Sequence, residues 1–197
     1  VATWQARALA ETDPVAKVQA MLALARCSDP DAELLSKAVT ALTKTSWESQ
    51  STSQQVDTMR ALAVCFIRLG GDAPSDEVTG TATQYLNSHF PAQDFSVNRE
   101  LSRLLVYLQA PETAARVMTL LENSPNQEEQ IHYAYVLRTL EESWTDELLE
   151  RYFAWFNEAK ASQRGGASFG GFLDQIRDRA VERISEAQKE KLQPILE

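Results

Sequence analysis

The sequence predicts an all-α fold, on two observations. Residues that favour helix N-termini recur along the chain, and each is followed by apolar residues three or four positions apart, the spacing of one helix face. No Asn-Gly or Asp-Gly turn joins runs of alternating polar and apolar residues, so no β-hairpin signal is present. Hydrophobic residues make up 44% of the 197 residues, with only seven Gly and seven Pro, which excludes a disordered or low-complexity chain.

The first three expected helices have clear start signals. Asp13-Pro14 combines an N-cap acceptor with a proline whose φ suits the first helical turn, and Asp29-Pro30 repeats this pair. A run rich in Ser and Thr over 46–53 precedes the third helix, which Gly70-Gly71 ends as a C-terminal cap. The apolar stripes after these starts are Val15, Val18, Leu22 and Ala25; Leu35, Ala38, Val39 and Leu42; and Val56, Met59, Ala63, Phe66 and Leu69.

The middle of the chain continues the same pattern. Ser75, Ser96 and Pro111 each begin a helix, and another follows Asn126. Their stripes are Val78, Ala82, Tyr85 and Leu86; Val97, Leu101, Leu104, Leu105 and Leu108; Ala114, Val117, Met118 and Leu121; and Tyr133, Val136, Leu137 and Leu140.

The last three expected helices begin at Thr145, at Ser168 and at the pair Ser185 and Gln188. Ser185 and Gln188 have the spacing of a capping box, in which each side chain satisfies a free backbone N–H group of the other residue. The two stripes before it are Leu149, Tyr152, Phe153 and Phe156, and Phe169, Phe172, Leu173, Ile176 and Ala180.

The spacing of these starts predicts how the helices pack. Short connections force sequence neighbours to lie antiparallel, and the resulting hairpins repeat every roughly 30 to 40 residues, the period of HEAT repeats. Ile131, Ala134, Leu148 and Trp155 lie off the main stripes, so their helices are expected to be covered on two sides. The prediction is therefore one domain over 1–197, a HEAT-like α-solenoid (α-α superhelix) of about five helical hairpins.

Several segments resemble one family of helical-repeat regions. They are Asn98–Leu108 with Pro111-Glu112 after it, Gln127–Tyr133, Tyr152–Asn157 and Arg164–Phe169. Together with the Asp-Pro openings they are similar to the HEAT-repeat region of large multidomain bacterial envelope proteins, from about Asp13 onward. In that family the region lies between a sugar-dehydrogenase-like propeller and a C-terminal c-type cytochrome domain.

The resemblance implies a scaffold beside redox modules, in a periplasmic or cell-envelope protein. The haem attachment motif Cys-x-x-Cys-His is absent from the sequence, so no cofactor carries over. The chain begins at Val1 without a methionine, and we expect it to be part of a larger protein. Its expected partners are sister domains of the same polypeptide or another protein.

The net charge and the hydropathy of the sequence argue against two further kinds of partner, nucleic acid and the membrane interior. The net charge is −9, from 19 basic and 28 acidic residues, and a surface of that sign repels nucleic acid. The longest apolar run is Ala61–Ile67, far short of the roughly 20 residues that cross a bilayer, so no membrane insertion by this segment is expected. Cys27 and Cys65 sit among apolar neighbours at helical spacing, which favours buried thiols over a disulfide.

No catalytic residue or metal site is expected. Glu129 and His132 share a helix face, but a di-metal centre needs a second such pair and further carboxylates. The other histidine, His89, has no acidic residue within four positions. We therefore expect a non-enzymatic chain without a cofactor, in which His132 is a structural, hydrogen-bonded residue.

The stretch from Arg164 to Gly171 contains residue types that can form an anion-binding site. Arg164, Gly165, Gly166 and Ser168 precede a helix, whose free N–H groups and dipole favour negative ligands. Neither known glycine-rich phosphate motif is present, so a tight turn between helices is the favoured interpretation.

Two features could form an interaction surface. Acidic residues dominate 122–150, among them Glu128, Glu129, Glu141 and Glu142, and form either a solvated face or a docking face for a basic partner. Aromatic residues cluster around Tyr152 and Trp155. Aromatic stripes at helical spacing are usually core, but these residues surround more than half of their helix, which makes Trp155 the candidate for an exposed ring at an interface.

These observations leave two functional hypotheses. The first is a non-catalytic scaffold or protein-interaction module in a larger, exported and redox-associated protein. The alternative is a ligand-binding, cofactor-binding or enzymatic helical domain, with a pocket formed by His132, Tyr135, Trp155 and the loop Gly165–Gly171.

Overall fold

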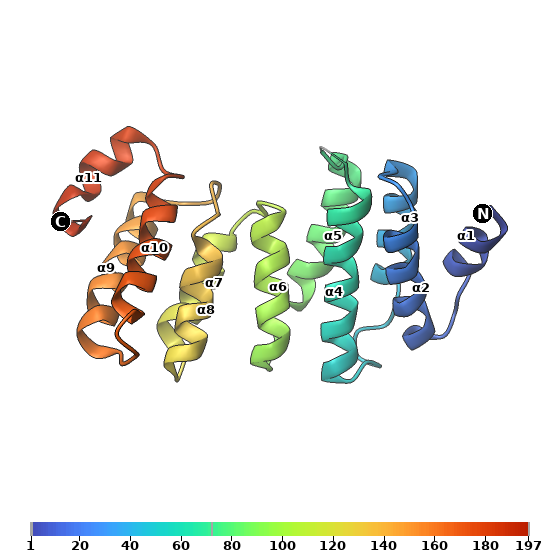
Figure 1. Ribbon diagram of the computed structural model, residues 1–197, viewed down its shortest axis with the longest axis horizontal. Coiled ribbons are helices and arrows are strands. Elements are labelled where there is room, and N and C mark those ends of the chain that lie inside the picture. The colour runs from blue at the N-terminus through green and yellow to red at the C-terminus, as the bar shows by residue number, and fades with distance from the viewer. Residues whose placement is uncertain (1, 72, 197) are drawn as a thin grey trace. The chain divides into compact units, whose positions relative to one another are not determined.

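The computed structural model describes residues 2–71 and 73–196, and within them the chain forms α-helices and no strand (Figure 1). The all-α prediction is confirmed. The helices are α1 (Ala2–Leu9), α2 (Pro14–Cys27), α3 (Ala32–Thr43), α4 (Thr52–Leu69), α5 (Asp76–His89), α6 (Phe95–Tyr107), α7 (Thr113–Asn123), α8 (Gln127–Leu137), α9 (Asp146–Ser162), α10 (Phe169–Val181) and α11 (Glu186–Leu196).

The chain divides into two compact units, 1–104 and 105–197. The division falls inside α6, between Leu104 and Leu105. Each unit has its own buried apolar core and is described separately below.

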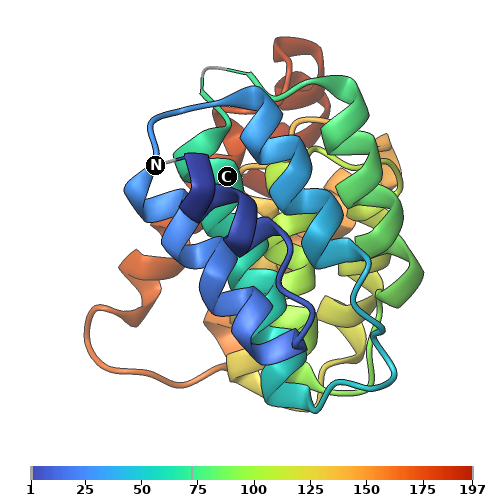
Figure 2. The same ribbon diagram turned by 90° about the vertical axis from the view of Figure 1, so that its right-hand side faces the viewer.

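In the first unit, α1, α2 and α3 each contact the next helix and the helix after next. α2 packs on α3 and α4, α3 packs on α4 and α5, and α1 packs on α2 and α3 (Figure 2). The core between α2, α3 and α4 is apolar and fully enclosed. Its largest side chains are Met21, Leu24, Leu35, Leu42, Met59, Leu62, Phe66 and Leu69, each at most 2% exposed. Burial of side chains of this size contributes about 1.5–3 kcal/mol each, so this core holds the unit together.

In the second unit α7 and α9 show the same packing pattern, around an aromatic core. α7 packs on α8 and α9, α9 packs on α10 and α11, and α8 packs on α10. Tyr133 of α8 and Tyr152, Phe153 and Phe156 of α9 are at most 1% exposed. The Tyr152 hydroxyl donates a 2.8 Å hydrogen bond to the carbonyl oxygen of Ala134, which joins α9 to α8 inside the core.

Local signals place most helix ends. The Asp13 carboxylate accepts from the Ala16 N–H at 2.8 Å, and Ser185 and Gln188 exchange hydrogen bonds of 3.3 and 2.9 Å as a capping box. Gly70 is the C-cap of α4, and Gly71 has a φ of +59°, a conformation that glycine adopts at low cost.

Four helix starts differ from the sequence prediction. α7 begins at Thr113, after the predicted start at Pro111, with Glu112 as its N-cap residue. α3 is capped by Asp31, whose carboxylate accepts from the Leu34 N–H at 2.9 Å, and begins after Asp29-Pro30. α6 begins at Phe95, because the Asp94 carboxylate binds the Ser96 N–H at 2.8 Å. α1 has no start signal in the sequence and was not predicted.

Candidate functional site

The structure places the expected aromatic surface in the core. Tyr152 is 0% and Trp155 is 8% exposed, because α10 and α11 pack against α9 and add to the cover from α7. The Trp155 ring lies edge-on to Phe156 with the ring centroids 5.1 Å apart. Of the two interpretations of this cluster, core and interaction surface, the burial supports the core, and neither Tyr152 nor Trp155 offers a surface to a partner.

Burial also settles the chemistry of Tyr152. It raises the pKa of the Tyr152 hydroxyl well above its ordinary value, since the phenolate would lose its hydration. The hydroxyl therefore stays protonated and acts as the donor of the bond to Ala134, a structural role.

Basic side chains from distant positions neutralise part of the acidic stretch 122–150. Arg151 of α9 pairs with Glu122, Arg183 pairs with Glu141, and Lys191 of α11 pairs with Asp146. Such exposed pairs contribute at most about 1 kcal/mol each to stability, but they lower the local negative charge.

The other acidic candidates divide between capping and exposure. Glu129 is half-buried, and its carboxylate accepts a 2.8 Å hydrogen bond from the Asn126 side chain at the start of α8. Glu128 and Glu142 are exposed. The acidic residues of this unit therefore lie on a surface that also carries the basic side chains paired with some of them.

His132 is half-buried on α8, with its ring edge-on to Tyr133 at 5.3 Å. Within 2–71 and 73–196 no three or more His, Cys, Asp and Glu side chains are grouped so that they could hold a metal ion.

The glycine-rich loop is fixed to α8 by side-chain amides. The Gln127 amide donates to the Arg164 carbonyl oxygen at 2.8 Å and accepts from the Arg164 N–H at 3.1 Å. The Gln163 amide donates to the Gln130 side chain at 2.7 Å. These bonds hold the loop, which joins α9 to α10, against α8.

The hollow beside this loop has mixed charge. Lys160 and Asp174 form an ion pair there, and hydrogen bonding from Lys160 lowers the pKa of the Asp174 carboxyl, so that it is ionised. Ser168 makes no side-chain cap bond to α10. A fixed carboxylate opposes an anion, so the geometry favours the structural interpretation of the loop.

The alternative pocket is not assembled by the fold. The hollow at the glycine-rich loop is lined by Lys160, Gln163, Arg164, Gly165, Gly166, Phe169, Gly170, Gly171 and Asp174. His132, Tyr135 and Trp155 do not line it, and Trp155 lies in the core while Tyr135 is exposed.

Sequence reasoning missed an aromatic cluster in the first unit. Trp47, in the connection before α4, stacks on His89 at the end of α5, with the ring centroids 4.1 Å apart and the planes 5° from parallel. Tyr85 lies edge-on to His89 at 4.8 Å. Tyr85 and His89 are four residues apart on α5, which is the one signal the sequence offered; Trp47 is too distant in sequence to be recognised.

Trp47 and His89 line a hollow of about 580 Å³, which is also lined by Gln55 and Asp94. Burial lowers the pKa of His89, partly opposed by the negative charge of Glu48, so the imidazole is neutral at pH 7. Burial raises the pKa of Tyr85 to about 12. The loop beside it is fixed by the buried Asn98 side chain, which bonds the Ala92 N–H at 2.7 Å and the Ala92 carbonyl oxygen at 2.8 Å.

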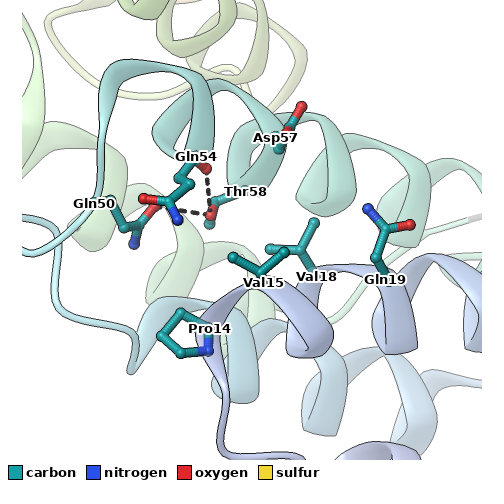
Figure 3. Close-up of a pocket in the computed structure, with 8 residues that line it drawn as sticks. All are labelled: Pro14, Val15, Val18, Gln19, Gln50, Gln54, Asp57 and Thr58. Carbon is teal, nitrogen blue, oxygen red and sulfur yellow. Dashed lines mark hydrogen bonds between the residues drawn. The ribbon is translucent and has the colours of Figure 1, made fainter.

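A second, smaller hollow lies between α2 and α4 (Figure 3). Its free volume is about 20 Å³, room for roughly one water molecule. Beside it the Thr58 hydroxyl lies 2.9 Å from both the Gln50 side-chain oxygen and the Gln54 carbonyl oxygen. The hollow has both apolar and polar side chains in its lining, and it is too small for an organic ligand.

Comparisons with known proteins add no identity: no family model, no curated protein and no solved structure matches the chain. Among the described helices, none combines the length and the apolar character needed to cross a bilayer.

Proposed function

We propose that the chain is a HEAT-like helical-repeat module that binds a sister domain or another protein and performs no chemistry of its own. One observation carries the proposal: in both units several helices pack on the helix after next as well as on the next helix, namely α1, α2 and α3 in the first unit and α7 and α9 in the second. In a solenoid every repeat buries one face in its own hairpin and another against the following repeat, which requires this pattern.

The polar side chains support a structural role. The side-chain amides of Gln109, Gln127 and Gln163 form hydrogen bonds between segments of the second unit that are about 30 or more residues apart in the sequence. Gln109 alone donates to the Thr139 carbonyl oxygen at 3.1 Å and accepts from the Glu141 N–H at 2.8 Å. Such bonds align successive hairpins, which leaves the exposed surfaces to carry function.

The resemblance to envelope proteins gives the proposal its setting. There the module would stand between exported redox domains, and its partners would be those domains. The competing proposal, a ligand pocket around His132, Trp155 and the loop Gly165–Gly171, is weaker because Trp155 is in the core.

Small-angle X-ray scattering of the purified chain tests the architecture. A compact chain of this length has a radius of gyration of about 16 Å, and a solenoid must exceed it, with a pair-distance distribution extended to long distances. Cross-linking and mass spectrometry of the full-length protein in its source cells then tests the role, with cross-links to one sister domain or one other protein expected. A compact particle, or cross-links only within this chain, would overturn the proposal.

A further inference from the structure

We infer that Tyr135, Phe172 and Arg138 form a contact surface of the second unit for a protein segment that carries a carboxylate beside an apolar side chain. The inference rests on the interaction role proposed above and names the chemistry of its partner.

Two aromatic rings form the apolar part of this surface. Tyr135 of α8 is 38% exposed and Phe172 of α10 is 41% exposed. Their rings stack with the centroids 6.4 Å apart and the planes 22° from parallel. Because each ring holds the other in place, a partner that covers them would gain apolar burial at a low cost in side-chain entropy.

Arg138 adds a fixed positive charge at the same place. Its guanidinium lies 3.3 Å from the centroid of the Tyr135 ring and donates a hydrogen bond to the Tyr135 carbonyl oxygen. Within the described part of the chain no carboxylate pairs with Arg138, whereas Arg151, Arg179 and Arg183 of the same unit each have an acidic partner.

This combination selects the chemistry of the partner. A guanidinium held over an aromatic ring, with donors left over, matches a carboxylate through two parallel hydrogen bonds. An apolar residue beside that carboxylate would cover the Tyr135–Phe172 pair. Tyr and Arg are also the residue types that most often contribute large binding energies at interfaces.

The start of α10 leaves the surface accessible. Gly170 and Gly171 precede Phe172, and both have open space where a side chain would project. A partner can therefore lie against the α10 backbone as it covers the Phe172 ring.

Selection of random peptides displayed on phage against the immobilised full chain tests the inference. We expect enriched peptides to carry Asp or Glu next to an aliphatic or aromatic residue. Synthetic versions should bind the Tyr135→Ala and Arg138→Glu variants about tenfold or more weakly than the unmodified chain. Added NaCl should weaken their binding to the unmodified chain, and this salt dependence should be smaller with Arg138→Gln.

Two variants are matched controls. Ile67→Ala removes an apolar side chain that is 69% exposed in the first unit. Arg164→Glu reverses the charge of an exposed arginine that, like Arg138, has no carboxylate partner among the described residues. Both should keep the unmodified affinity. Circular dichroism must show that all variants keep their helix content.

The outcomes separate this surface from the proposed function. Peptides that bind the unmodified chain and all variants equally would overturn the surface but leave an interaction module, with its site elsewhere. A selection that enriches no common sequence would also overturn the surface. Failure of the proposed function is measured independently, by the scattering and cross-linking experiments.

Discussion

His89 shows how tertiary contacts change the chemistry of a single residue. In the sequence it is an isolated histidine at the end of an expected helix. In the structure Trp47 covers one face of its ring and Tyr85 approaches from the side, and the resulting burial disfavours the imidazolium.

A pH dependence of stability follows from this burial. The folded pKa of His89 lies below its ordinary value of 6.5, so the unfolded chain binds a proton at this residue more readily. We expect its stabilising contribution to be complete above pH 6.5 and to be lost as the pH falls through the folded pKa. The loss stays below the limit of about 1.4 kcal/mol per pH unit that one group can cause.

Urea denaturation of the unmodified chain and of His89→Gln at pH 7.5 and pH 5.5 measures this contribution. The free energy of unfolding should fall less in the variant between the two pH values. An equal fall in both proteins would show that His89 is not the group responsible.

The glycine-rich loop provides a second test at single residues. A Cβ atom at Gly165 would lie 2.4–2.5 Å from the Cγ and Cβ atoms of Phe169, which cannot move without shifting the backbone. We expect Gly165→Ala to lower the free energy of unfolding by about 1–3 kcal/mol. This loss would be measured by thermal or urea denaturation.

Gly170→Ala is the matched control, because Gly170 lies in α10 with open space around its Cα. It should be neutral or stabilise by up to about 1 kcal/mol. If both variants behaved alike, the close approach of Phe169 to Gly165 would be disproved.

At the scale of the element, the start of α3 shows where local signals compete. The sequence offered Asp29-Pro30 as cap and first turn, but Asp31 takes the cap. The Asp31 N–H donates to the Leu69 carbonyl oxygen at 3.0 Å, which ties this residue to the end of α4, while its carboxylate caps α3. A tertiary bond thus decides between two capping residues that are two positions apart.

Two substitutions distinguish these caps. Asp31→Ala should cost about 1 kcal/mol of unfolding free energy, because the Leu34 N–H loses its acceptor. Asp29→Ala should change the free energy of unfolding by at most about 0.5 kcal/mol. Urea denaturation of both variants measures the difference, and a larger loss for Asp29→Ala would place the cap at Asp29.

The other helices show how far periodicity reaches. The stripes led by Val97 and Tyr133 predicted buried faces that the structure confirms. The stripe that begins at Leu149 is also buried, whereas periodicity left its neighbour Trp155 open between core and surface, and the structure buries it. Periodicity shows which residues share a face, while the number of helices that cover the element depends on distant parts of the chain.

At the scale of the molecule, the fold determines which charged side chains lie next to one another. The first unit carries nine basic and 12 acidic residues and the second carries ten and 16, so most of the net charge of −9 lies in the second unit. Within that unit Arg151, Arg183 and Lys191 lie against acidic residues far away in sequence. Arg138 has no such acidic partner among the described residues.

The apolar stripes placed Val15 and Phe172 on buried faces, but these side chains are 52% and 41% exposed. Otherwise the sequence by itself determined the helical class, most helix boundaries and most of the core. These depend on backbone hydrogen bonding and side-chain periodicity within about one or two helical turns, which can be recognised in any short window. Only the tertiary structure decided which aromatic rings are exposed, which carboxylates are ion-paired and which histidine stacks on a tryptophan. Those properties depend on packing between residues far apart in the chain, as the burial of Trp155 and the exposure of Tyr135 illustrate.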